Sequence, residues 1–234
     1  MVDFGSIPLD EGIKKELMQL QIGYAFQPIF YPDGKEVFAR EALMRPKGKT
    51  VIELIKEYEE AGKLHVLEVA TLFGAISEFN ARGYSEYVTI NSFPAESLTD
   101  EEASVFDAYF GESKGRGIIE VLEYTVVDLK KWERKRDVLR KKNLSIALDD
   151  FGTGNNNVLA VDLFAPKIVK LDRSVISDID KDVNKQERYF YYCDYMHKRG
   201  VLLLAEGVET KEEFEFLKSN EIDLLQGFYL GKPE

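Results

Sequence analysis

The stretch Leu148-Asp149-Asp150-Phe151-Gly152-Thr153-Gly154 places two adjacent acidic residues at the end of an apolar run that begins at Leu144. The apolar run predicts a buried strand, and the glycines predict a loop at its end. Two ionised carboxylates side by side repel each other, and a divalent cation with oxygen ligands is the simplest group that stabilises both. Asp is also common at turns and helix N-caps, so the pair taken alone favours a solvated turn.

Composition limits the size and class of the protein. The chain has 234 residues and is 44% hydrophobic, which is enough to bury one large core, so we expect residues 1–234 to form a single domain. Its 42 acidic and 31 basic residues give a formal net charge of -11. Such a charge argues against binding of a nucleic acid polymer, and an anionic ligand would need a metal ion beside it.

Cysteine content and hydropathy indicate the compartment. The single cysteine, Cys193, cannot form a disulfide within the chain, and we interpret it as a small buried apolar residue in a reducing environment. Residues 1–21 contain no apolar run as long as that of a signal peptide, and no later segment is apolar for long enough to span a bilayer. The sequence therefore predicts a cytoplasmic protein without a membrane segment.

The first part of the chain predicts a helix followed by a β-hairpin. Residues Leu9–Leu20 repeat apolar side chains at intervals of three and four, and we expect this helix, within residues 1–20, to cap the core. Two strand-like runs, Tyr24–Phe30 and Val37–Met44, flank the turn signal Pro32-Asp33-Gly34-Lys35. A turn this short makes the two strands antiparallel neighbours.

Helical and strand-like patterns then alternate to the end of the chain. The helical segments are Val51–Ala61, an amphipathic run Val66–Phe79, Glu101–Phe110, Leu129–Lys141, Lys185–Lys198 and Lys211–Lys218. The further strands are Tyr87–Ile90, Gly117–Leu122, Leu144–Leu148, Lys167–Leu171, Val201–Ala205 and Ile222–Leu225. Eight strands in all predict an α/β fold, a TIM-type (β/α)8 barrel modified by an N-terminal antiparallel hairpin strand, with an open doubly wound sheet as the alternative.

Polar residues stand at the C-terminal ends of these strands. They are Glu41, Asn91, Glu120, Asp149, Asp150, Lys170, Glu206 and Gln226. In a barrel these ends meet at one mouth, so residues that are far apart in the sequence become neighbours. Because polar groups are costly to bury without partners, the repetition at equivalent positions favours a functional site over surface decoration.

The residue types in this set indicate the chemistry. Carboxylate and amide oxygens suit Mg²⁺ or Mn²⁺, and the lack of Cys or His in the set argues against zinc. We interpret His65 and His197 as structural or solvated residues. Five or more acids can hold two metal ions, and two metal ions beside a lysine suit the attack of an activated water on a phosphodiester. The chain has no GxxxxGK[ST] loop, which argues against a P-loop nucleotide triphosphatase.

In their order and spacing, these residues resemble the EAL-domain family of cyclic di-GMP phosphodiesterases. The matching motifs are Gln27-Pro28-Ile29, Glu41-Ala42-Leu43 with Arg45, Asn91-Ser92, Glu120-Val121-Leu122-Glu123, the stretch Asp149 to Gly154, Lys170-Leu171-Asp172, Ala205-Glu206-Gly207-Val208-Glu209-Thr210 and Gln226-Gly227-Phe228. Each motif is weak alone, but together they cover nearly the whole chain. The resemblance implies a bacterial signalling enzyme that hydrolyses cyclic di-GMP to linear pGpG.

The resemblance also implies a role for each matching residue. One metal ion, Mg²⁺ or Mn²⁺, would be bound by Glu41, Asn91, Glu120 and Asp149. A second would be bound by Asp149, Asp150 and Glu206, so that Asp149 bridges the two. Lys170 would hold the attacking water and offset charge in the transition state, and Glu206 is also the implied general base.

Further residues are implied around this centre. Glu123 would anchor the loop from Phe151 to Asn157, and so support catalysis. The resemblance assigns four residues to the substrate: Gln27, Arg45, Glu209 and Gln226. Arg45 would contact a substrate phosphate. Glu209 and Gln226 would either contact the substrate or support the residues that contact it.

The chain departs from the usual family pattern at three places. Leu122 stands where Thr is usual, Pro46 where Trp is usual, and Asn155-Asn156-Asn157 where a Tyr-Ser-Ser-like run is usual. These positions bear on the active-site loop and on the contact of a possible homodimer. The alternative function is an inactive EAL-like module that binds cyclic di-GMP or a protein partner. Because every implied metal ligand is present, the sequence favours the enzyme.

Overall fold

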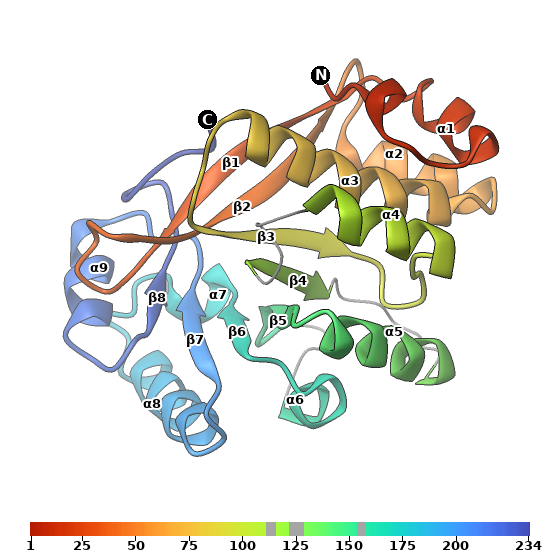
Figure 1. The fold of residues 1–234 in the computed structure, drawn as a ribbon. Helices are drawn as coiled ribbons and strands as arrows, with labels where there is room; N and C mark the ends of the chain where they lie inside the picture. Colours follow the sequence, from red (N-terminus) through yellow and green to blue (C-terminus); the bar gives the residue numbers. More distant parts are fainter. Residues whose placement is uncertain (111–115, 122–128, 154–157) are drawn as a thin grey trace.

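The computed structural model describes residues 1–110, 116–121, 129–153 and 158–234, and within them eight strands form a closed barrel (Figure 1). The strands follow one another around the barrel in sequence order. They are β1 (Ile22–Phe30), β2 (Val37–Pro46), β3 (Tyr87–Ser92), β4 (Gly117–Val121), β5 (Ser145–Phe151), β6 (Ile168–Leu171), β7 (Leu202–Ala205) and β8 (Leu224–Leu225). The prediction of a closed TIM-type barrel is therefore confirmed, and the open sheet is excluded.

The first strand runs in the opposite direction to the others. It pairs antiparallel with β2 on one side and with β8 on the other, whereas the remaining neighbours are parallel. The turn between β1 and β2 contains Gly34 with a φ of 68°, a left-handed conformation that glycine adopts without strain. The predicted antiparallel hairpin is confirmed, and its register sets Gln27 opposite Glu41.

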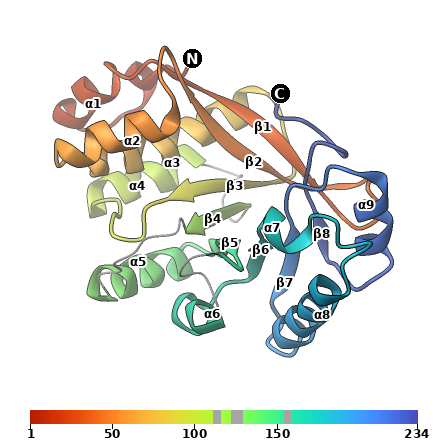
Figure 2. The same cartoon turned by 180° about the vertical axis from the view of Figure 1, so that it is seen from behind.

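Helices cover the outside of the barrel, as Figures 1 and 2 show from opposite sides. In order they are a 3-10 turn (Phe4–Ser6), α1 (Glu11–Leu17), α2 (Val51–Glu60), α3 (Leu64–Ala81), α4 (Asp100–Phe110), α5 (Leu129–Lys141), α6 (Val158–Phe164), α7 (Arg173–Ile176), α8 (Val183–His197) and α9 (Lys211–Lys218). Three of them, the 3-10 turn, α6 and α7, are not predicted from the sequence. The 3-10 turn and α7 are too short to show a helical period, and α6 is apolar on most sides. None of the described helices is both long and apolar enough to cross a bilayer.

Helix α3 differs from its prediction as an amphipathic helix. It is buried almost all round, including Leu67, Thr71 and Leu72 outside the predicted face. The reason is that α3 packs on β1, β2 and β3 and is also covered by α1 and α2. A helix enclosed on all sides has no solvated face to reveal in its sequence period.

The apolar core lies in two places. The larger cluster fills the space between barrel and helices and contains large buried side chains such as Phe73, Trp132 and Tyr189. Cys193 is buried in the same cluster, which confirms its interpretation as a small apolar residue. The smaller cluster lies inside the barrel and forms the layer beneath its mouth.

One of the two histidines joins α3 to α4. His65 Nε2 lies 3.0 Å from Glu102 Oε1, and this hydrogen bond raises the pKa of His65 above its ordinary value. The contribution of the pair to stability is fully present below the unfolded-state pKa of about 6.5 and is lost as pH rises through the higher folded-state pKa.

We expect His65→Gln to lower the free energy of unfolding by up to about 1 kcal/mol near pH 6 and by less near pH 8.5, because the pair is partly exposed. Urea unfolding of both proteins at the two pH values measures this. Glu102→Gln should weaken the same pH dependence, although Glu96 Oε2 still lies 3.8 Å from His65 Nδ1. An equal loss at both pH values would show that the charge of His65 contributes nothing.

Candidate metal-dependent active site

The inside of the barrel has an apolar floor and a polar mouth, because alternate residues of a strand point to the same side of the sheet. Seven strands contribute to the floor: Ile29, Ala39, Ile118, Ala147, Ile168, Leu204 and Leu224. In β3 the equivalent residue is Thr89, which pairs in register with Ile118. Two residues nearer the mouth, each strand, or the residue directly after β7 and β8, carries a polar side chain. These eight residues form the polar ring: Gln27, Glu41, Asn91, Glu120, Asp149, Lys170, Glu206 and Gln226.

Lys170 of β6 is at the centre of the polar ring. Its Nζ lies 2.8 Å from Glu206 Oε1, 2.9 Å from Asp149 Oδ1, 3.0 Å from Glu120 Oε2 and 3.8 Å from Glu41 Oε1. Only 1% of the side chain is exposed. Burial alone would lower the pKa of Lys170, but the four carboxylates hold it well above its ordinary value. One ammonium therefore faces four carboxylates, which leaves the polar ring with an excess of negative charge.

Two of the acids have raised pKa values, chiefly because they are buried. Burial raises the pKa of Glu120 to about 8, and burial likewise raises the pKa of Glu206 well above its ordinary value. Both oxygens of Glu120 are buried and accept no hydrogen bond from the described residues, although the Lys170 ammonium lies close to one of them. A buried carboxylate without hydrogen bonds is costly, and a cation that binds it directly would remove the cost.

A second grouping of acids lies at the end of β5. Asp149, Asp150 and Glu206 each offer one oxygen, and these oxygens lie within 4.8 Å of one another. The pairing of β5 with β6 is irregular between Leu148 and Phe151, and Asp150 has a φ of 50°, so the backbone turns its carboxylate away from the regular strand. Together with the buried carboxylate of Glu120, this donor set fits divalent cations that prefer hard oxygen ligands.

Two amide side chains lie where β1 and β8 pair antiparallel, Gln27 on β1 and Gln226 directly after β8. Each donates a hydrogen bond to another group of the protein. Gln226 is buried, and its Nε2 donates to Glu41 Oε2 at 2.7 Å. Gln27 Nε2 donates to the carbonyl oxygen of Gly231 at 3.0 Å. Gln226 therefore fixes the orientation of Glu41, while Gln27 holds the C-terminal segment against β1.

Arg45 and Asn91 line a common pocket beside the polar ring. The pocket has a volume of about 250 Å³, and its other walls are mainly apolar side chains of β2, α2 and α3. Arg45 is exposed and donates from Nη1 to the Met44 carbonyl at 3.0 Å. An exposed guanidinium at the edge of the mouth can reach an anionic group of a bound molecule.

The remaining residues of the predicted site lie around this centre or outside the described residues. Glu209 lies after β7 and pairs with Arg173, whose Nη2 is 2.8 Å from Glu209 Oε2. Glu123, Leu122 and Asn155–Asn157 belong to the segments outside the described residues. Sequence reasoning missed Arg173 and its other partner Glu213, although Thr210-x-x-Glu213 is a recognisable helix capping box.

A TIM-type barrel whose mouth gathers carboxylates around one lysine defines a protein with a candidate divalent-metal site. The chain belongs to the EAL domain family, whose family model matches residues 11–233. Among solved structures it is similar to a standalone EAL protein from Vibrio cholerae O395 in its c-di-GMP bound form, with a TM-score of 0.83, 26% identity and 92% of each chain covered. It is also similar to BlrP1 of Klebsiella pneumoniae in a manganese and cyclic di-GMP complex, with a TM-score of 0.77, 26% identity, and 91% of this chain and 56% of that chain covered.

Curated relatives carry the same kind of domain within longer chains. Cyclic di-GMP phosphodiesterase PdeR of Escherichia coli (strain K12) is 26% identical over 96% of this chain and 36% of its own length. Biofilm architecture maintenance protein MbaA of Vibrio cholerae serotype O1 is 23% identical over 96% of this chain and 30% of its own length. The chain spans between 12% and 36% of the length of eight such relatives.

Gly227 fixes the loop that carries Glu206. A Cβ atom at Gly227 would lie 2.1 Å from the Val208 carbonyl oxygen, and that oxygen accepts a hydrogen bond from the Tyr229 amide. We expect Gly227→Ala to push this loop away from β8 and to lower the free energy of unfolding by about 1–3 kcal/mol or more.

Denaturant unfolding measures the loss at Gly227. Gly23→Ala is the matched control, because a Cβ atom there would have its nearest contact at an ordinary 3.8 Å. Equal stability of the two variants would show that the loop moves at no cost.

Proposed function

We propose that this chain is a metal-dependent phosphodiesterase that hydrolyses one 3'-5' phosphodiester bond of cyclic di-GMP and releases linear pGpG. The observation that carries the proposal is the polar ring, in which Lys170 lies within 4 Å of four carboxylates that the family pattern also requires. Membership of the EAL family and similarity to proteins solved with cyclic di-GMP support the choice of substrate.

We infer that two sets of side chains in the mouth would hold divalent cations, Mg²⁺ or Mn²⁺. The first set is Glu41, Asn91, Glu120 and Asp149, and the second is Asp149, Asp150 and Glu206. Cations bound there supply positive charge for the phosphate oxygens and make a bound water more acidic. The hydrogen bond from Gln226 to Glu41 keeps one oxygen of that carboxylate fixed, so that the other remains directed towards the mouth.

Lys170 and Glu206 would act on the reacting atoms. Glu206 takes a proton from the water, whose oxygen then attacks phosphorus while the bond from phosphorus to the 3' oxygen breaks. The departing 3' oxygen takes up a proton from solvent and ends as a hydroxyl group, and Glu206 releases its proton to solvent. The Lys170 ammonium, 2.8 Å from Glu206, keeps that carboxylate oriented and stabilises the negative charge that grows on the phosphoryl oxygens.

Substrate contacts would come from the rim of the mouth. Arg45 is exposed beside the 250 Å³ pocket and would pair with a phosphate. Glu209 would accept hydrogen bonds from the substrate, whereas Gln27 and Gln226 would act mainly through the protein groups that they bind. Glu123 is proposed as the anchor of the loop after β5.

The test is incubation of the purified chain with cyclic di-GMP and Mg²⁺ or Mn²⁺, followed by chromatography of the nucleotides. We expect pGpG to appear only when the cation is present, and EDTA to abolish its formation. Binding of intact cyclic di-GMP without any product would instead establish the alternative, an inactive cyclic di-GMP-binding or protein-interaction module.

We also propose that residues 1–234 act as one domain in the cytoplasm. The buried Cys193 thiol is consistent with a reducing compartment. A homodimer remains a proposal, and sedimentation analysis with and without cyclic di-GMP would test it.

A further inference from the structure

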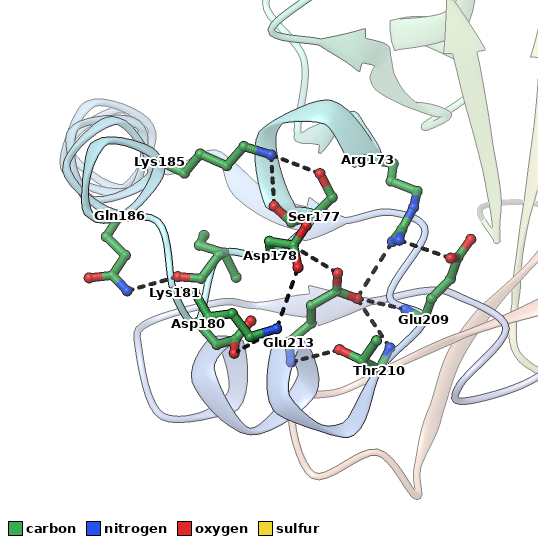
Figure 3. A network of polar contacts seen from close by, with 11 residues as sticks. Arg173, Ser177, Asp178, Asp180, Lys181, Lys185, Gln186, Glu209, Thr210 and Glu213 are labelled. Atoms are coloured by element: carbon green, nitrogen blue, oxygen red, sulfur yellow. Dashed lines mark hydrogen bonds and ion pairs between the residues drawn. The ribbon is translucent and has the colours of Figure 1, made fainter.

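One buried carboxylate connects the loops that follow β6 and β7 (Figure 3). Glu213 of α9 is 2% exposed, and its Oε1 accepts a hydrogen bond from the Asp178 amide at 3.1 Å. Its Oε2 accepts from the amides of Glu209 and Thr210 at 2.9 and 3.1 Å. Each oxygen of this side chain therefore binds a different loop.

Arg173 closes the same network from the β6 side (Figure 3). Its Nη2 lies 2.8 Å from Glu209 Oε2, its Nη1 lies 3.5 Å from Glu213 Oε2, and Nη1 also donates to the Gly207 carbonyl. Gly207 has a φ of 67°, and a Cβ atom there would lie 3.0 Å from the Arg173 side chain. The arginine thus packs directly on the backbone next to Glu206.

The network lies just beyond the two residues that face each other in the mouth. Arg173 is on the segment that follows Lys170, and Glu209 is on the segment that follows Glu206. Since Lys170 Nζ and Glu206 Oε1 are only 2.8 Å apart, a shift of either loop changes this contact.

Capping of helix α9 does not account for all of these bonds. Helix α2 begins with the same capping box, in which Glu53 Oε2 accepts from the Thr50 amide and the Glu53 amide donates to Thr50 Oγ1. Glu53 is exposed, and among the described residues its side chain makes no hydrogen bond to a second loop. Glu213 has the same two cap bonds and adds contacts with Asp178, Glu209 and Arg173.

We propose that Glu213, together with Arg173, is a positioning residue that fixes Glu206 relative to Lys170 for metal binding and hydrolysis. This inference rests on the proposed function for its catalytic part. Neither residue touches the reacting atoms, and both act through the backbone of the loop from Glu206 to Thr210.

The test compares Glu213→Gln with Glu53→Gln. Each change replaces one carboxylate oxygen of a capping-box glutamate by an amide nitrogen. In Glu213→Gln an NH₂ group must face the amide of at least one loop, so we expect a 10- to 100-fold fall in kcat and a similar weakening of Mn²⁺ binding, with KM changed less. Mn²⁺ affinity is measured without substrate by titration calorimetry. Glu53→Gln should change neither quantity, although both variants should melt at a lower temperature.

The possible outcomes separate the two proposals. If Glu213→Gln lowers only the melting temperature, and keeps kcat and Mn²⁺ affinity per folded molecule within twofold of wild type, Glu213 is a helix cap alone. If the wild-type chain does not hydrolyse cyclic di-GMP, the proposed function fails, and Mn²⁺ affinity still decides the positioning role.

A second variant keeps the inference testable if Glu213→Gln does not fold. Arg173→Lys retains the charge at a partly exposed position but cannot keep all three contacts of the guanidinium. We expect it to weaken Mn²⁺ binding in the same direction, and unchanged Mn²⁺ binding would overturn the inference.

Discussion

We expect Asp149→Ala to abolish the proposed hydrolysis of cyclic di-GMP, with turnover falling by at least ~10³-fold, the upper end of the loss for one preorganised electrostatic group. Asp149 is the residue that both proposed cation sets share. Its Oδ1 lies 2.9 Å from Lys170 Nζ, and its carboxylate also belongs to the group of three whose oxygens lie within 4.8 Å. Without it, neither set keeps its full charge.

The fold should survive this change, because Asp149 follows the apolar part of β5 and removal of one acid reduces the repulsion in the mouth. Steady-state hydrolysis, metal content and thermal unfolding are measured together. Asp149→Asn should be as inactive as the alanine variant, since it keeps the shape and loses the charge. The control is Asp162→Ala, which removes an exposed acid of α6 whose Oδ1 lies 3.7 Å from Arg199 Nε. This variant should be fully active. Normal metal content with near wild-type turnover in Asp149→Ala would remove Asp149 from the proposed ligands.

Much of the fold could be predicted from the sequence because each strand carries its own signal. Parallel strands covered by helices are short apolar runs, and the turn Pro32 to Lys35 indicates the antiparallel pairing of β1 with β2. The missing elements have physical reasons. Helix α7 has four residues, which is about one turn, so it shows no helical period. Helix α3 was predicted as a helix, but the prediction that it has one apolar face was wrong because it is enclosed on nearly every side.

The polar ring could be predicted for the same reason that the barrel could. Closure of the barrel and the two-residue period of a strand together place one side chain of each strand above the apolar floor. The sequence therefore indicated which residues meet, such as Glu120, Asp149 and Lys170.

What the ring residues bind could not be predicted in the same way. The bond from Gln226 to Glu41 joins residues 185 positions apart, and the sequence leaves open whether that amide faces substrate or protein. The bonds of Glu213 to Asp178 and Glu209 depend on how α9 packs against the loop after β6, which no local pattern encodes.

Substitution of Lys170 distinguishes an effect on turnover from an effect on stability more clearly than substitution of any acid of the polar ring. Its partners are Glu41, Glu120, Asp149 and Glu206, and not the neighbouring Asp172, which caps α7 by accepting from the Ser174 amide. Lys170 is therefore not placed as an ion-pair partner of Asp172. In the proposed reaction its ammonium would face the phosphoryl oxygens on which charge grows, so it should stabilise the transition state more than the bound substrate.

We expect Lys170→Ala to lower turnover by at least ~10²-fold while changing the affinity for cyclic di-GMP far less. Lys135→Ala is the matched control, because Lys135 is also a buried lysine, 4% exposed, and its Nζ lies 2.8 Å from Glu68 Oε1, outside the polar ring. Each change leaves a buried carboxylate without its cation and should destabilise the fold by about 3–5 kcal/mol. Single-turnover kinetics per folded molecule, measured beside thermal unfolding, then distinguish the two lysines. A Lys170→Ala protein that is less stable but turns over as fast as Lys135→Ala would show that the ammonium serves the fold and not the reaction.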